Sequence, residues 1–124
     1  MSKQYKFIKF QGVYHRGDTR IGINKSGLVR LSSGFCRTTN VKYFKYAVLF
    51  YDETNKAIAF KFTNTLEDGA LRITADDTAA AVSAKAFMST NNLNLSDWAG
   101  RYDWDKLNIK GIGEVYIVEF GSKK

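Results

Sequence analysis

The apolar residues of this chain come in short runs, and turn-forming residues separate one run from the next. The longest run, Tyr46 to Tyr51, has the length of one buried strand. Proline occurs nowhere in the 124 residues, so Gly, Asn, Asp and Ser must form the turns. Short runs joined by such turns are typical of antiparallel strands. We therefore predict one α+β domain, residues 1–124, with a mostly antiparallel β-sheet or barrel and two short helices.

The expected strands are rich in β-branched and aromatic residues, which favour a pleated, half-buried backbone. Between the second and third of them, Asn24 to Gly27 form a hairpin turn in which Gly27 is available for a positive φ. The strands are predicted at residues 5–14, 20–24, 28–31, 45–51, 57–62, 70–74, 100–107 and 113–120.

Two helices are expected between these strands, with a helical turn near residues 96–100. The first is predicted to begin at Ser32 or Ser33, whose hydroxyl can cap it, and to end near Asn40. Its apolar anchors are Phe35, Cys36 and Val41. The second helix is predicted within residues 79–93, with a cap near Ser83. Its inward-facing residues are predicted to be Ala86, Phe87 and Leu93.

The two halves of the chain carry the same short motif, Phe-x-x-Thr-x-Asn followed by an aliphatic residue. It begins at Phe35 in the first half and at Phe87 in the second. Each copy follows a predicted strand and leads into two more, which end at Phe62 and at Phe120. Self-similarity of this kind usually reflects duplication. We predict a pseudo-twofold domain made of two internal repeats, residues 20–63 and 70–120.

This unit of strand, short helix and two strands resembles the AbrB/MraZ family of swapped-hairpin transcription factors. The resemblance starts at Gly27–Phe35, runs on to Phe62, and recurs loosely over Ala79–Phe120, which together make roughly two thirds of the chain. The family has a proline where the strand meets the helix, an acidic, Arg-containing helix and a Gly-Asp turn after it. Here proline is absent, the helix is rich in Ser and Thr, and Lys42–Lys45 replaces the turn. The resemblance implies DNA binding through basic residues on strands and turns, often as a dimer.

The whole chain has a net charge of +7, and its positive charge is concentrated in the first half. Residues 1–51 hold ten Lys or Arg against one acid, Asp18, whereas residues 52–124 hold nine against eleven. A positive face of this kind attracts polyanions. We predict that DNA or RNA binds to the basic residues that flank two predicted turns and the start of the first helix: Arg16, Arg20, Lys25, Arg30 and Arg37.

Aromatic residues lie among these cations, and their exposure bears on the kind of nucleic acid. An exposed ring can stack on the bases of a single strand, but we expect each of these rings to pack in the core. The rings are those of Tyr14, Phe35, Tyr43 and Tyr46. The alternative function is a protein-interaction or structural module, in which the cations serve solubility and an aromatic patch or strand edge meets a protein. Polyanion binding weakens sharply with salt, whereas an aromatic interface does not.

No residue pattern in the chain indicates catalysis or metal binding. His15 and Cys36 are the only residues of their types, and neither has the spacing of a nucleophile and its base. Cys36 is expected to be a small core residue. The acidic residues are interpreted as parts of turns and solvated loops rather than metal ligands: Asp76, Asp77, Asp97, Asp103, Asp105 and Glu114. We predict no enzymatic activity, no cofactor and no metal.

The location and assembly of the protein are inferred from the same composition. The first residues lack the apolar stretch of a signal peptide, and no apolar run approaches the length of a membrane span. We therefore expect a cytoplasmic protein with no membrane partner. The oligomeric state stays open at this point, with a homodimer as one option.

Overall fold

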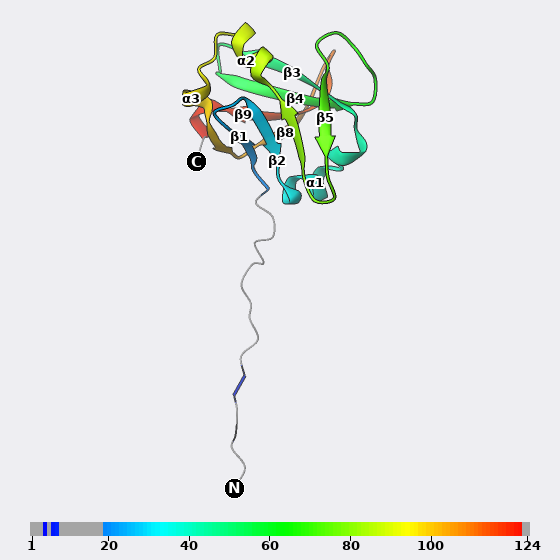
Figure 1. Cartoon of the computed structure of the whole chain (residues 1–124), viewed down its shortest axis with the longest axis vertical. Coiled ribbons are helices and arrows are strands. Elements are labelled where there is room, and N and C mark those ends of the chain that lie inside the picture. The colour runs from blue at the N-terminus through cyan, green and yellow to red at the C-terminus, as the bar shows by residue number, and fades with distance from the viewer. Residues whose placement is uncertain (1–3, 5, 8–18, 123–124) are drawn as a thin grey trace.

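The computed structural model describes residues 4, 6, 7 and 19–122, in which nine antiparallel strands form one curled sheet (Figure 1). The strand order is β7-β1-β2-β6-β5-β3-β4-β9-β8. The strands are β1 (Ile21–Ile23), β2 (Leu28–Leu31), β3 (Tyr46–Asp52), β4 (Ala57–Thr63), β5 (Leu71–Ala75), β6 (Ala80–Ser83), β7 (Gly100–Tyr102), β8 (Asp105–Ile109) and β9 (Gly113–Glu119). The helices are α1 (Ser33–Thr39), α2 (Lys85–Thr90) and α3 (Leu95–Trp98), with 3-10 turns η1 (Val41–Tyr43) and η2 (Phe120–Ser122).

The expected α+β class with an antiparallel sheet is confirmed, and the sheet is a half-barrel. Its edge strands β7 and β8 lie at opposite ends of the strand order, yet only Asp103 and Trp104 separate them in the chain. A flat sheet of this size would be about 38 Å wide, which two residues cannot span, so the sheet must curl. The Trp104 indole Nε1 donates to the Thr19 carbonyl at 2.7 Å, which ties the residues before β1 to this link.

The centre of the core is a group of aromatic rings around Phe35. This α1 side chain is fully buried and meets Trp104, Tyr116 and Phe62 edge-on, with centroids 5.2, 5.4 and 6.1 Å away. Edge-to-face pairs of this kind each contribute about 0.5–1.5 kcal/mol beyond the burial of their area. The helix that follows β2 is thereby packed against strands from the other side of the sheet.

A second aromatic group lies around Trp98 of α3. Its ring packs against those of Phe120 and Tyr102, with centroids 5.0 and 5.9 Å away. The Tyr102 hydroxyl donates to the Trp98 carbonyl at 2.5 Å, so this buried polar group is satisfied. α3 and β7 are therefore fixed to each other and to the end of β9.

The predicted hairpin at Asn24–Gly27 is confirmed. The Asn24 carboxamide oxygen accepts hydrogen bonds from the backbone N–H groups of Ser26 and Leu28, each at 3.0 Å. Gly27 has a φ of +90°, and a Cβ there would lie 2.9 Å from the Cα of Lys85. Gly27 is therefore required both by its backbone conformation and by the close approach of α2.

The second predicted helix is wrong at its start, because residues 80–83 form strand β6. The side chains of Ala80 and Val82 are buried, whereas Ala81 is half-buried and Ser83 is exposed, which is the period-two pattern of a strand. β6 pairs with β2 on one side and β5 on the other. This pairing outweighs the helix propensity of the alanines. Within the predicted range 79–93, α2 is the helical part, and Ser83 does not cap it. Ala86 is exposed rather than inward-facing, and Met88 is the buried residue of this helix.

The remaining elements follow the prediction with small differences. α1 begins after Ser32, whose side-chain oxygen accepts from the Phe35 backbone N–H, and Phe35, Cys36 and Val41 are buried as expected. The described part holds three α-helices rather than two, since the helical turn expected at 96–100 is α3. The strand predicted at 100–107 is split into β7 and β8, and the strand predicted at 5–14 lies almost wholly outside the described residues. None of the helices within residues 19–122 has the length and apolar character needed to cross a membrane.

Candidate nucleic-acid interface

The four predicted basic residues that the structure describes lie on different elements and do not form one cluster. Arg16 lies outside the described residues, and Lys25 is exposed in the β1–β2 turn. Arg20 precedes β1 at the other end of this hairpin, where its carbonyl accepts from the Ser32 hydroxyl at 3.3 Å. Arg30 is exposed on β2, and Arg37 is exposed on α1. The cations are thus distributed along β2 and its two ends.

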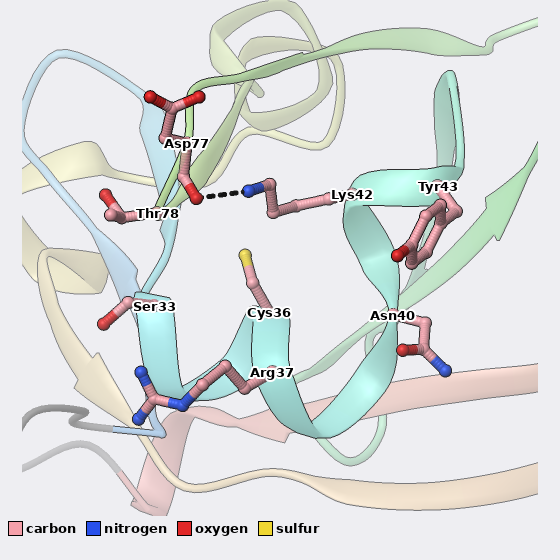
Figure 2. Close-up of a pocket in the computed structure, with 8 residues that line it drawn as sticks. All are labelled: Ser33, Cys36, Arg37, Asn40, Lys42, Tyr43, Asp77 and Thr78. Atoms are coloured by element: carbon pink, nitrogen blue, oxygen red, sulfur yellow. Dashed lines mark hydrogen bonds between the residues drawn. The ribbon is translucent and has the colours of Figure 1, made fainter.

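A hollow beside α1 contains one of these cations together with residues that the sequence prediction did not include. Its volume is about 460 Å³ (Figure 2). The residues that line it are Ser33, Cys36, Arg37, Asn40, Lys42, Tyr43, Asp77 and Thr78. They come from α1, from η1 and from the β5–β6 turn, and we call this site the α1 hollow.

The end of α1 sets the direction of the side chains that follow it. Asn40 adopts the left-handed conformation, with φ of 59°, and its backbone N–H donates to the Cys36 carbonyl at 3.1 Å. Asn tolerates this conformation better than most residues, and it ends the helix here. The chain then turns into η1, where Val41 is buried. From η1, the Lys42 side chain extends towards Asp77, whereas the Tyr43 side chain lies on the opposite side of this turn.

Lys42 joins the two walls of the hollow. Its ammonium Nζ donates to the backbone carbonyl of Asp77 at 2.6 Å (Figure 2). An ammonium has three donors, so further N–H groups are available to an anion. The Arg37 side chain extends along α1 towards Ser33, so that its guanidinium lies on the side of the helix where Ser33 lines the hollow.

The β5–β6 turn that forms the opposite wall is held by Asp76. Its carboxylate accepts from the backbone N–H groups of Ala79 and Thr78, both at 2.8 Å, and from the Thr78 hydroxyl at 3.2 Å. These hydrogen bonds, with the nearby charge of Lys42, hold the pKa of Asp76 below its ordinary value. The interpretation of Asp76 and Asp77 as turn residues is therefore confirmed, and the Asp76 carboxylate is committed to this turn.

Tyr43 stands at the rim of the hollow with 80% of its surface exposed. The prediction that it packs in the core is wrong, because the short turn of η1 buries Val41 and directs Tyr43 to solvent. Phe35 is buried as predicted, Tyr46 is half-buried, and Tyr14 lies outside the described residues. Strict alternation through Val41, Lys42 and Tyr43 would place Tyr43 on the buried side with Val41, so the local sequence carries no signal for this exposure.

Cys36 is a core residue, as predicted, although its thiol borders the hollow (Figure 2). Its Sγ donates to the Leu31 carbonyl at 3.5 Å. Burial raises the pKa of the thiol, and the positive charge of Lys42 offsets only part of this effect. The thiol is therefore neutral near pH 7, which makes it a poor nucleophile.

The acidic residues outside this site that the structure describes do not gather around a common centre. Glu114 forms an ion pair with Lys106 at 3.4 Å, and both side chains are about half exposed. Among residues 4, 6, 7 and 19–122, no group of three or more His, Cys, Asp or Glu side chains is placed to hold a metal ion. His15 lies outside the described residues. No protein-family model, curated protein or solved structure matches the chain.

Proposed function

We propose that this protein binds single-stranded nucleic acid at the α1 hollow. The observation that carries the proposal is the exposed ring of Tyr43 next to two cations, Arg37 and Lys42. Guanidinium and ammonium groups contact phosphates, while an exposed aromatic ring stacks on a base and contributes about 1–3 kcal/mol. Bases in a duplex are already stacked on one another, so the ring favours an unpaired strand.

The charge of the surrounding chain supports this proposal. Residues 19–51, which run from β1 to β3, hold six Lys or Arg and no Asp or Glu. A surface formed by this segment attracts phosphates over several ångströms, and the attraction falls as salt screens it.

We also propose that the chain is internally duplicated, because strands that correspond in the two repeats pair with each other. The alignment of Leu31 with Val82 makes β2 correspond to β6. Equivalent strands that neighbour each other across a twofold axis must be antiparallel. β2 and β6 are antiparallel neighbours in the sheet.

The last strands of the repeats support the same axis. When Phe62 is aligned with Phe120, β4 corresponds to β9 and Phe60 to Val118. β4 and β9 are antiparallel neighbours as well, and the hairpins β1–β2 and β3–β4 of the first repeat have their counterparts in β5–β6 and β8–β9.

The helix ends provide independent support for the repeat. Asn40 and Asn92, the Asn residues of the two Phe-x-x-Thr-x-Asn motifs, both adopt the left-handed conformation, with φ of 59° and 56°. On this basis α3 and β7 are an insertion in the second repeat, where β7 pairs with β1. The whole is a single-chain counterpart of a swapped-hairpin dimer of the AbrB/MraZ kind, and we expect a monomer by sedimentation.

The proposed function is tested by fluorescence anisotropy with labelled single- and double-stranded DNA and RNA at low and physiological salt. We expect single strands to bind more tightly, and affinity to fall with salt. Tyr43→Ala should weaken binding about tenfold, whereas Tyr43→Phe keeps the ring and should bind like the wild type.

The contribution of charge is measured with the double variant Arg37→Ala/Lys42→Ala. It should lower the slope of affinity against salt by roughly 0.7 for each phosphate that the variant no longer neutralises. Lys56→Ala/Lys110→Ala is the matched control, since it removes the same charge from two exposed residues in the β3–β4 and β8–β9 turns, on the other side of the sheet. Absence of binding to every polymer at low salt would overturn the proposed function and favour the alternative of a protein-interaction module.

A further inference from the structure

The outer face of β2, β6 and β5 is a second surface with cations and small side chains. Val29, Val82 and Ile73 point inward and are buried, so their neighbours in each strand face outward. The registers place Arg30 beside Ala81 and Ala81 beside Thr74. An exposed guanidinium therefore borders a floor of small side chains.

The floor of this face is hollowed into one continuous groove. Two depressions, of about 200 and 690 Å³, share Leu28, Thr74 and Ala81 in their linings. Arg30 lines the first depression and Arg72 lines the second. We call the combined surface the basic groove. It runs along the strands between two exposed arginines.

The basic groove meets the α1 hollow at the β5–β6 turn. Asp76 and Ala79 of this turn line the groove, whereas Asp77 and Thr78 line the hollow. At its other end the groove reaches Ser83 and Ala86 and so ends beside α2. A ligand that leaves the hollow over this turn therefore enters the groove directly.

The charge of this side of the sheet is consistently positive. The five strands β1, β2, β5, β6 and β7 contain Arg30, Arg72 and Arg101 and no Asp or Glu. Along the path, the described lining residues include two carboxylates, those of Asp76 and Asp77. Their repulsion is reduced because Asp76 accepts three hydrogen bonds in its turn and Lys42 lies next to both residues.

We propose that a nucleic-acid strand held in the α1 hollow continues along the basic groove, where its phosphates contact Arg30 and Arg72. This proposal rests on the proposed function and extends it to the course of the strand. The small side chains of Thr74, Ala81 and Ser83 let the sugar-phosphate backbone approach the sheet closely. A flexible single strand can bend over the β5–β6 turn between the two parts of the site.

The proposal predicts that binding depends on oligonucleotide length in a way that the groove arginines control. Anisotropy is measured with labelled oligothymidylates of about 4 and about 12 nucleotides, lengths within the range of known single-strand sites. Arg30→Ala/Arg72→Ala should weaken the longer oligonucleotide about tenfold and lower its salt slope by roughly 1.4, because two phosphates are no longer neutralised. The short oligonucleotide, which fits the hollow alone, should lose less than about twofold.

Controls separate the failure of this proposal from that of the proposed function. Lys56→Ala/Lys110→Ala removes equal charge and should leave both affinities near wild type. Circular dichroism should show an unchanged fold for every variant. If Arg30→Ala/Arg72→Ala binds the long oligonucleotide like wild type while Tyr43→Ala weakens both lengths, the groove is not used and the hollow is. If neither oligonucleotide binds the wild-type protein at low salt, both proposals are overturned.

Discussion

Both sides of the curled sheet are built from antiparallel strands, but the residues on their outer faces differ in chemical character. On the side of β2, β6 and β5 the outward residues are small or cationic, with Arg30 next to Ala81. On the side of β3, β4, β9 and β8 the register aligns Phe50, Ala59 and Ile117. These three residues line an apolar groove of about 550 Å³, together with Leu107, which is 51% exposed.

The difference shows that outward positions of this sheet are not determined by the fold. The apolar side has its own buried residues, Val48, Ala57 and Val115, which lie outside the main core cluster. The basic side has no such layer among the described residues. Substitutions on the basic face should therefore change ligand affinity with little effect on stability, whereas those on the apolar face affect packing.

The two sides are held together through Phe35, and its removal is expected to have the largest effect. Phe35→Ala should lower the free energy of unfolding by about 3–5 kcal/mol, since it deletes a fully buried ring and leaves a cavity. Urea denaturation measures this loss. Phe35→Leu fills most of the space and should cost about 1.5 kcal/mol. Losses below about 1 kcal/mol in both variants would show that the ring contacts with Trp104, Tyr116 and Phe62 do not join the sides.

The next largest effect is a loss of stability at alkaline pH through Tyr102 of β7. Burial raises the pKa of Tyr102 to about 12, whereas the unfolded value is about 10. The folded protein therefore retains a proton that the unfolded chain releases, so this stability is complete below pH 10 and is lost as pH rises towards 12. Two pKa units correspond to about 2–3 kcal/mol.

Urea unfolding at several pH values between about 8 and 12 measures this effect. Tyr102→Phe cannot ionise and should show a shallower alkaline decline. Some decline should remain, because burial also raises the pKa of Tyr116. An unchanged pH profile in Tyr102→Phe would mean that another group is responsible.

The first half of the fold was more predictable from sequence than the second. The turn at Asn24–Gly27 and the caps of α1 depend on local chemistry, which the sequence displays. Residues 80–83 form a strand because β2 and β5 flank them, and that pairing is a long-range contact. An alanine-rich segment has helix propensity in isolation, so only the tertiary context distinguishes the two outcomes.

The positive charge of the candidate site could be predicted from the sequence, whereas most of the residues that line it could not. The excess of Lys and Arg before residue 52 points to the segment that contains α1 and η1. Lys42 enters the α1 hollow because Asn40 reverses the chain, and Asp77 and Thr78 enter it from a distant turn. The exposure of Tyr43 depends on a single turn of 3-10 helix, which single-sequence patterns resolve poorly.

The contrast between the two sides can be reduced by placing an acid on the basic groove. Thr74→Glu puts a carboxylate beside Ala81, and it should weaken binding of the longer oligonucleotide about fivefold at low salt. Thr65→Glu, in the exposed β4–β5 loop, is the matched control and should change affinity less than about twofold. Equal losses in the two variants would indicate a response to net charge alone.

The smallest effect is expected from removing the acid that lies in the α1 hollow. Asp77→Asn deletes a carboxylate but keeps the backbone carbonyl that Lys42 contacts, so the wall of the hollow should stay in place. Affinity for the short oligonucleotide should rise about twofold at low salt, because phosphate repulsion is removed, and the gain should vanish as salt screens it. Asp68→Asn, in the β4–β5 loop, makes the same charge change at an exposed residue that does not line the hollow. A similar gain in both variants would mean that long-range attraction, rather than contact in the hollow, governs binding, whereas a gain in Asp77→Asn alone would place the phosphate next to this turn.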